Sequence, residues 1–112
     1  MTLFEKIVAR EIPADILAED DELIVFRDVN PQAPIHVLLV PKKPIKRLSE
    51  AAAEDAVILG KLLLKAKEIA QLLGVSQRGF RVVINNGSYG GETVPHLHLH
   101  LLAGRPLHWP PG

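Results

Sequence analysis

Apolar and imidazole side chains alternate along Val94-Pro-His-Leu-His-Leu-His-Leu-Leu102. A period of two is that of a β-strand, whose successive side chains point to opposite faces. The pattern predicts a strand with His96, His98 and His100 on one face and the intervening leucines on the other. The leucine face can pack on a core, so three titratable rings stand in a row on the opposite face.

Four other short apolar segments have the length and composition of strands, and they cover residues 16–19, 23–28, 35–40 and 80–85. The segment 35–40 is almost entirely apolar, as expected of a central strand with both faces covered. We therefore expect a five-stranded antiparallel sheet.

Two segments have helical signals. Thr2 and Glu5 form a capping box at the start of a short helix. A long helix is expected from Ser49, as its N-cap, to Leu73, with Gly74 as the stop. At ~1.5 Å per residue it would be about 35 Å long and would cover one face of the sheet or contact a second subunit. The fold class is thus α+β.

Composition narrows the class of protein. The 112 residues form one domain, 1–112, and 13 basic residues balance 13 acidic ones, so nothing draws the chain toward nucleic acid or an anionic membrane. There is no cysteine, which excludes disulfides and cysteine-based zinc sites. No apolar run approaches ~20 residues and no targeting segment is evident, so a cytoplasmic protein is expected.

The row of histidines has three interpretations. The rings can be tolerated polar residues of a strand. Two neighbouring rings, about 6.6 Å apart, could share a metal ion, but the outer pair is too far apart for all three to do so. In the third interpretation one ring is a nucleophile at phosphorus and its neighbours donate hydrogen bonds. The glycine-rich turn Asn86-Gly-Ser-Tyr-Gly-Gly91, just before the histidines, is a candidate phosphate cradle.

The pattern His-φ-His-φ-His-φ-φ, with φ apolar, fits residues 96–102 at every position and is the signature of the histidine-triad (HIT) family. Three more segments resemble the Hint branch of this family: Asp28-Val-Asn-Pro-Gln-Ala-Pro-Ile-His36, Val40-Pro-Lys-Lys43 and His108-Trp-Pro-Pro-Gly112. The resemblance implies the HIT fold and a homodimer with a continuous ten-stranded sheet.

The resemblance also implies an activity, the hydrolysis of purine nucleoside 5′-phosphoramidates with release of AMP or GMP. His98 would be the nucleophile and form a nucleotidyl-histidine, with His96 and His100 beside it. His36 would hydrogen-bond His96 and orient it. No metal and no cofactor are needed in this scheme.

The family pattern assigns further residues to the substrate. Gly91 and Thr93 would hold phosphate oxygens, Asn85 would lie near the ribose–phosphate end, and Asp28 would accept from both ribose hydroxyls. The base pocket would be formed by Leu3, Phe4, Ile7, Phe26 and Val29. Trp109, in the C-terminal tail, would reach toward the partner subunit and influence substrate preference.

Two alternatives stay open. One is a dinucleoside polyphosphate hydrolase or nucleotidyltransferase of the same family, although the transferase branch replaces the last triad histidine and His100 is present here. The other is a nucleotide-binding regulatory module without turnover.

Overall fold

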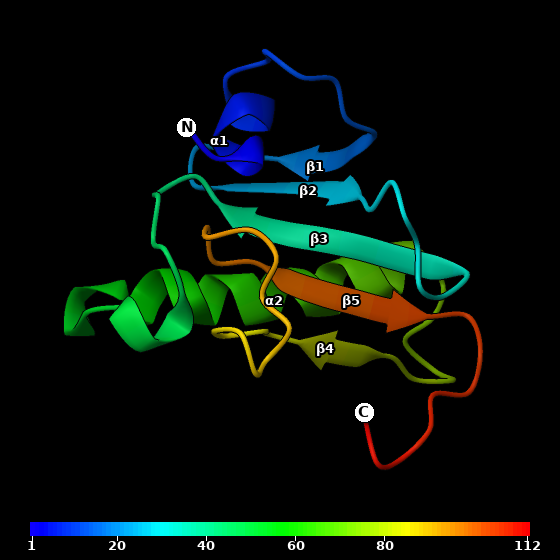
Figure 1. Ribbon diagram of the computed structural model, residues 1–112. Helices are drawn as coiled ribbons and strands as arrows, with labels where there is room; N and C mark the ends of the chain where they lie inside the picture. Colours follow the sequence, from blue (N-terminus) through cyan, green and yellow to red (C-terminus); the bar gives the residue numbers. More distant parts are fainter.

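The computed structural model describes residues 1–112. Its centre is one antiparallel sheet with the strand order β1-β2-β3-β5-β4 (Figure 1). The five strands expected from the sequence are all present: β1 (Ile16–Glu19), β2 (Leu23–Arg27), β3 (Ile35–Pro41), β4 (Arg81–Val83) and β5 (Leu99–Ala103). The apolar β3 is the central strand, as predicted, and it pairs with β2 and β5.

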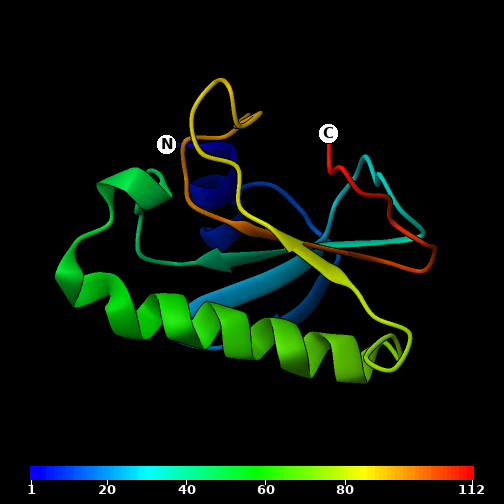
Figure 2. The same cartoon turned by 90° about the horizontal axis from the view of Figure 1, so that it is seen from below.

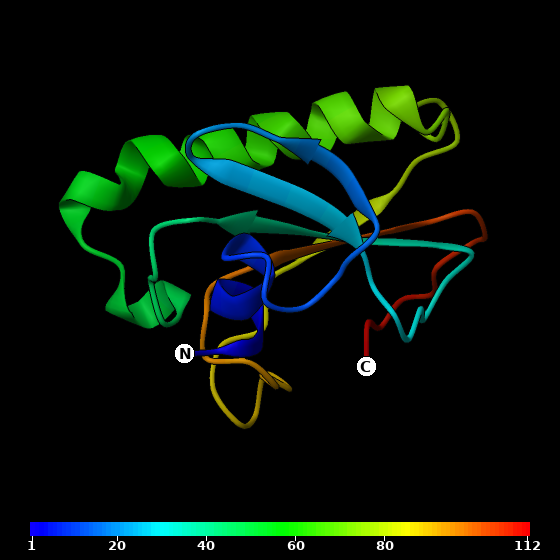
Figure 3. The same cartoon turned by 90° about the horizontal axis from the view of Figure 1, so that it is seen from above.

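The two helices cover opposite faces of the sheet (Figures 2 and 3). The short helix α1 (Leu3–Val8) begins with the predicted capping box, in which Thr2 and Glu5 exchange hydrogen bonds of 3.0 and 3.2 Å. The long helix α2 (Ala56–Leu72) crosses the other face. Gly74 follows it at φ +72°, in the left-handed conformation expected of the stop.

Alternation within the strands separates two cores. Leu23 and Val25 of β2 face α2, whereas Ile24 and Phe26 face α1. The same alternation in β3, and in β5 together with the residue before it, places His36, His98 and His100 on the α1 face and the intervening apolar residues in the larger core under α2. The candidate chemistry therefore lies on the face that α1 covers only in part.

The long helix begins later than the sequence predicts. Residues 48–55 form two 3₁₀ turns, Leu48–Glu50 and Ala53–Asp55, separated by extended backbone at Ala51 and Ala52. The Ser49 side chain caps nothing. Instead Asp55 accepts from the Ala52 amide at 2.8 Å and pairs with Lys43 at 2.6 Å, which fixes the chain just before α2. The helix has 17 residues and is about 25 Å long rather than about 35 Å.

Two predicted strands are also shorter than expected. β4 ends at Val83, and β5 begins only at Leu99, so His96 and His98 precede the strand. The Leu97 amide donates to the Ile45 carbonyl at 2.7 Å, outside the sheet ladder. Alternation nevertheless continues through this segment, because Leu97 is buried under α2 with the leucines of β5.

No helix has the length and apolar character that a membrane crossing requires.

Candidate active site

His98 is held with one ring nitrogen free. It is 6% exposed, and its Nδ1–H donates to the His96 carbonyl at 2.7 Å. That bond fixes the hydrogen on Nδ1, so Nε2 carries the lone pair. The Phe4 ring of α1 packs edge-on against the imidazole with centroids 4.7 Å apart. The geometry is that of an oriented, neutral imidazole.

His96 is the most enclosed of the three rings. It is 1% exposed, and its Nε2–H donates to the Pro41 carbonyl at 2.7 Å. Its Nδ1 has no partner. The expected hydrogen bond from His36 to His96 is therefore wrong. His96 lies level with the end of β3 at Pro41, whereas His36 is near the start of that strand.

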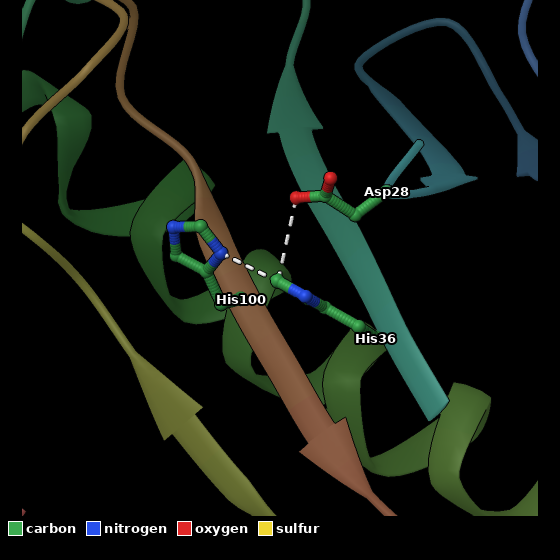
Figure 4. A group of neighbouring side chains, drawn as sticks. All are labelled: Asp28, His36 and His100. Carbon is green, nitrogen blue, oxygen red and sulfur yellow. Dashed lines mark hydrogen bonds and ion pairs between the residues drawn. The ribbon is translucent and has the colours of Figure 1, made fainter. Parts of the chain in front are cut away.

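His36 contacts His100 instead, because Leu38 of β3 pairs with His100 of β5 and His36 lies two residues before it on the same face. The Gln32 amide donates to His36 Nδ1 at 3.0 Å, so His36 carries its hydrogen on Nε2. That Nε2–H donates to His100 Nδ1 at 2.9 Å (Figure 4). The His100 hydrogen is therefore on Nε2, and one backbone amide sets the tautomers of two rings.

Asp28 completes this group at the end of β2. Its Oδ2 lies 3.5 Å from His36 Nε2 (Figure 4). Its Oδ1 accepts from the Asn30 amide at 2.8 Å. One carboxylate oxygen is thus fixed by the turn that follows the strand. The other faces the pair formed by His36 and His100.

Burial lowers the pKa of three rings of the site, those of His98, His100 and His36. It lowers the pKa of His98, and the neighbouring His96 ring adds to the effect, while the bond to the His96 carbonyl opposes it. It lowers the pKa of His100 to about 4, with His98 and His36 adding to it. Burial also lowers the pKa of His36, against the charge of Asp28. The three imidazoles are therefore neutral at pH 7.

A cavity of about 290 Å³ opens beside these rings on the α1 face. Nine residues predicted from the sequence line it together: Leu3, Phe4, Ile7, Phe26, Asp28, Val29, Thr93, His98 and His100. Its wall is mostly apolar, and Asp28, Thr93, His98 and His100 add polar groups, a combination that suits a flat base attached to a polar sugar phosphate.

Sequence reasoning missed six residues of the cavity wall: Ile12, Pro13, Ala14, Arg27, Leu38 and Val94. Leu38 was open to prediction, since it is two residues from His36 and shares its face. The segment 12–14 carries no motif, and only the packing of the chain after α1 brings it to the cavity.

Asn85, Gly91 and Trp109, which the family pattern assigns to the substrate, do not line the cavity. Gly91 lies in the turn before Thr93 at φ +81°. Trp109 is 81% exposed, and its ring stacks on the Arg81 guanidinium at 5.9 Å. Within the single chain Trp109 therefore lies outside the cavity wall.

The metal interpretation can be tested on the hydrogen bonds. Asp28, His36 and His100 each offer a ligand atom, and these atoms lie within 4.8 Å of one another. A cation bound through His36 Nε2 would move the hydrogen of that ring to Nδ1. The Gln32 amide already points its own hydrogen at Nδ1, so the two hydrogens would clash. The group therefore suits hydrogen bonding rather than metal ligation.

Comparisons with known proteins agree with this geometry. Residues 9–107 match the model of the HIT domain family. An uncharacterized HIT-like protein of Synechocystis sp. is 62% identical over 111 residues, which cover 99% of this chain and 96% of that protein. The adenylylsulfatase HINT1 of Arabidopsis thaliana is 46% identical over 113 residues, covering 99% of this chain and 76% of that protein.

A solved structure extends the agreement to the fold. The crystal structure of a HIT family hydrolase from Legionella pneumophila superposes with a TM-score of 0.98 at 46% identity, and all of both chains is covered. The sequence match, the strand order and the paired histidines lead to one assignment: the chain belongs to the histidine-triad (HIT) family.

Proposed function

We propose that the protein is a hydrolase of purine nucleoside 5′-phosphoramidates that acts through a nucleotidyl-histidine. The observation that carries this proposal is the 2.7 Å hydrogen bond from His98 Nδ1 to the His96 carbonyl. It leaves an unprotonated Nε2 on a buried imidazole that lines a mostly apolar cavity. An oriented neutral imidazole can attack phosphorus and divide one difficult displacement into two easier ones.

In the first step His98 Nε2 forms a bond to phosphorus and the P–N bond breaks. The amine departs with the electron pair of that bond and takes a proton from a water molecule, while His100 Nε2–H, whose direction His36 fixes, donates a hydrogen bond to the departing nitrogen. In the second step the hydroxide formed from that water attacks phosphorus. The bond to His98 breaks, and the nucleoside monophosphate is released.

The cavity supports a nucleoside in one orientation. The base would lie among Phe4, Ile7 and Phe26, the ribose would reach the free oxygen of Asp28, and the phosphate would lie between His98 and Thr93. This arrangement would put the reacting phosphorus beside His98, the ring of the cavity wall that has a free lone pair. Hydrogen bonds to the non-bridging oxygens would stabilise the charge that builds up there during transfer.

A second substrate is suggested by the Arabidopsis relative, whose name states that it cleaves adenylyl sulfate. The first step would be the same, but the leaving group would be sulfate, which needs no proton. Hydrolysis of the phosphoramidate should depend on His100 more strongly than hydrolysis of adenylyl sulfate, because only an amine leaving group depends on a proton donor.

We also propose that the protein is a homodimer with a ten-stranded sheet. β4 is an edge strand whose ladder groups on one side have no partner in the single chain. Phe80, just before β4, and Trp109, beside Arg81 of β4, are exposed apolar side chains near this edge. Sedimentation equilibrium would give twice the monomer mass, and a monomer at micromolar concentration would contradict the proposal.

Steady-state hydrolysis tests the activity. Adenosine 5′-phosphoramidate, adenosine 5′-phosphosulfate and a diadenosine polyphosphate are compared in the presence of EDTA, with wild type and His98→Ala. We expect the phosphoramidate to have the highest kcat/KM and His98→Ala to lose several orders of magnitude. AMP binding without turnover of any substrate would instead favour a regulatory nucleotide-binding module.

A further inference from the structure

The segment from Pro41 to Ser49 supports the loop that leads into the histidines. It contacts that loop at four points, two of which involve the triad segment itself: the bonds from His96 to Pro41 and from Leu97 to Ile45. The other two contacts, Ser49 with Asn86 and Arg47 with Glu92, hold the glycine-rich turn. The position of the turn therefore depends on residues far away in sequence.

The contact between Arg47 and Glu92 is the strongest of the four. Arg47 donates from Nε and Nη2 to the two carboxylate oxygens of Glu92 at 2.9 and 3.1 Å, which is the bidentate geometry. The side chain of Glu92 is only 11% exposed and that of Arg47 28%. Glu92 also accepts from the Gly87 amide at 2.9 Å, so its carboxylate closes the turn.

A closed turn is needed here because the backbone is tightly wound. Gly87 and Gly91 have φ of +74° and +81°, and a Cβ at Gly90 would lie 2.6 Å from the Asn86 carbonyl. Thr93, which lines the cavity with His98, follows Glu92 directly. The carboxylate that closes the turn therefore fixes the position of the phosphate end of the site.

A carboxylate and a phosphate are both negatively charged and repel each other at short distance. Glu92 is ionised, since the bonds from Arg47 and Gly87 lower its pKa, and it directly precedes Thr93, which lines the cavity with His98. Without a counter-charge it would repel a substrate phosphate bound at His98. Arg47 supplies that counter-charge at hydrogen-bond distance, and it also pairs with Glu50.

We infer that Arg47 is a positioning residue for the phosphate end of the site: its pair with Glu92 allows a carboxylate to close the glycine turn without repelling the substrate phosphate. The inference rests on the proposed function, which puts the phosphate between His98 and Thr93. It concerns binding of the phosphate and leaves the base pocket unaffected.

Affinities for AMP and adenosine, measured by isothermal titration calorimetry at low and at high salt, test the inference. Arg47→Met leaves Glu92 charged and unpaired, and we expect it to weaken AMP binding by about 10-fold at low salt. Adenosine, which has no phosphate, should change by less than about twofold. A residue that only stabilises the fold would weaken both ligands alike, so the ratio of the two affinities is the informative quantity.

A double variant separates charge from geometry. Arg47→Met with Glu92→Gln removes the charge while the amide oxygen of the glutamine can still accept from Gly87. We expect it to recover most of the AMP affinity that Arg47→Met loses. Lys61→Met is the matched control, because it leaves Glu22 without its partner on the α2 face of the sheet and should not change the ratio.

The outcomes distinguish this inference from the proposed function. If wild type binds AMP no more tightly than adenosine, the phosphate assignment fails and both proposals fall. If wild type prefers AMP but Arg47→Met keeps that preference, only the inference is overturned. A double variant as weak as Arg47→Met would also overturn it. Circular dichroism and thermal unfolding establish that each variant is folded. If Arg47→Met alone does not fold, the double variant is compared with wild type instead.

Discussion

His36 Nε2 and His100 Nδ1 lie 2.9 Å apart, and the Gln32 amide at 3.0 Å from His36 Nδ1 determines which of them donates. The direction of this chain matters for catalysis. It leaves the hydrogen of His100 on Nε2, where it can serve a leaving group. In the other tautomer His100 would offer a lone pair to an amine that needs a proton.

Replacing His36 tests this relationship. In His36→Phe the ring of His100 is free to change tautomer, and we expect kcat for a phosphoramidate to fall by about 10–100-fold, as is typical of residues that orient a catalytic group. Hydrolysis of the phosphosulfate, which needs no proton, should fall much less. Gln32→Ala keeps the backbone amide and is the control. Equal losses for both substrates would show that His36 does not act through proton donation.

The buried imidazoles make stability depend on pH. The pKa of His100 is lowered from 6.5 to about 4, and those of His36 and His98 are lowered too, so the unfolded chain binds more protons than the folded one in this range. Their contribution to stability is complete above pH 6.5 and is lost as the pH falls toward 4. We expect Tm to decrease across this window.

His100→Gln removes one of these groups and should flatten the dependence of Tm on pH. His108→Gln, at an exposed position, is the matched control. If the His100 variant follows the wild-type curve between pH 6.5 and 4, the lowered pKa of His100 is not a source of acid sensitivity.

Asp28 is expected to discriminate ribose from deoxyribose. One of its oxygens accepts from the Asn30 amide at 2.8 Å, which leaves the other for the sugar hydroxyls. Wild type should lose about 10–100-fold in kcat/KM on a 2′-deoxyadenosine phosphoramidate, as for a lost hydrogen bond to a charged group. Asp28→Asn should reduce that discrimination. A variant that still rejects the deoxy substrate as strongly would assign sugar recognition elsewhere.

The C-terminal tail is expected to affect the choice of leaving group. Within one chain it contacts β4, where Arg81 donates to the His108 carbonyl at 2.8 Å and stacks on Trp109, and not the cavity. In the proposed dimer it can reach the partner's site. Deletion of residues 106–112 should change the relative kcat/KM across a panel of amines, with Trp109→Ala showing part of the change. Unchanged ratios in a dimeric deletion variant would contradict this role.

Local signals in the sequence predicted the strands, the capping box of α1 and the shared face of His98 and His100, because these depend on periods of two and on neighbouring residues. The start of α2 was not predictable in this way. Ser49 has the right residue type for a cap, but its backbone amide donates to the Asn86 side chain. The pair formed by Asp55 and Lys43 fixes the chain before the helix instead.

Contacts that depend on register were also beyond the sequence. The pairing of Leu38 with His100 decides that His36 reaches His100 rather than His96. The pair formed by Arg47 and Glu92 spans 45 residues, and neither residue belongs to a motif. The family pattern indicates which residue types are needed, whereas the strand register determines which of them meet.

The covalent nucleotide on His98 is the most direct test of the central claim. Enzyme is mixed rapidly with adenosine 5′-phosphoramidate and quenched in neutral denaturant, which preserves a P–N bond, and its peptides are analysed by mass spectrometry. The mechanism predicts one adenylyl group on the peptide that contains His98, formed before AMP appears and absent from His98→Ala. Turnover by His98→Ala at the wild-type rate, or an adduct on another residue, would contradict it.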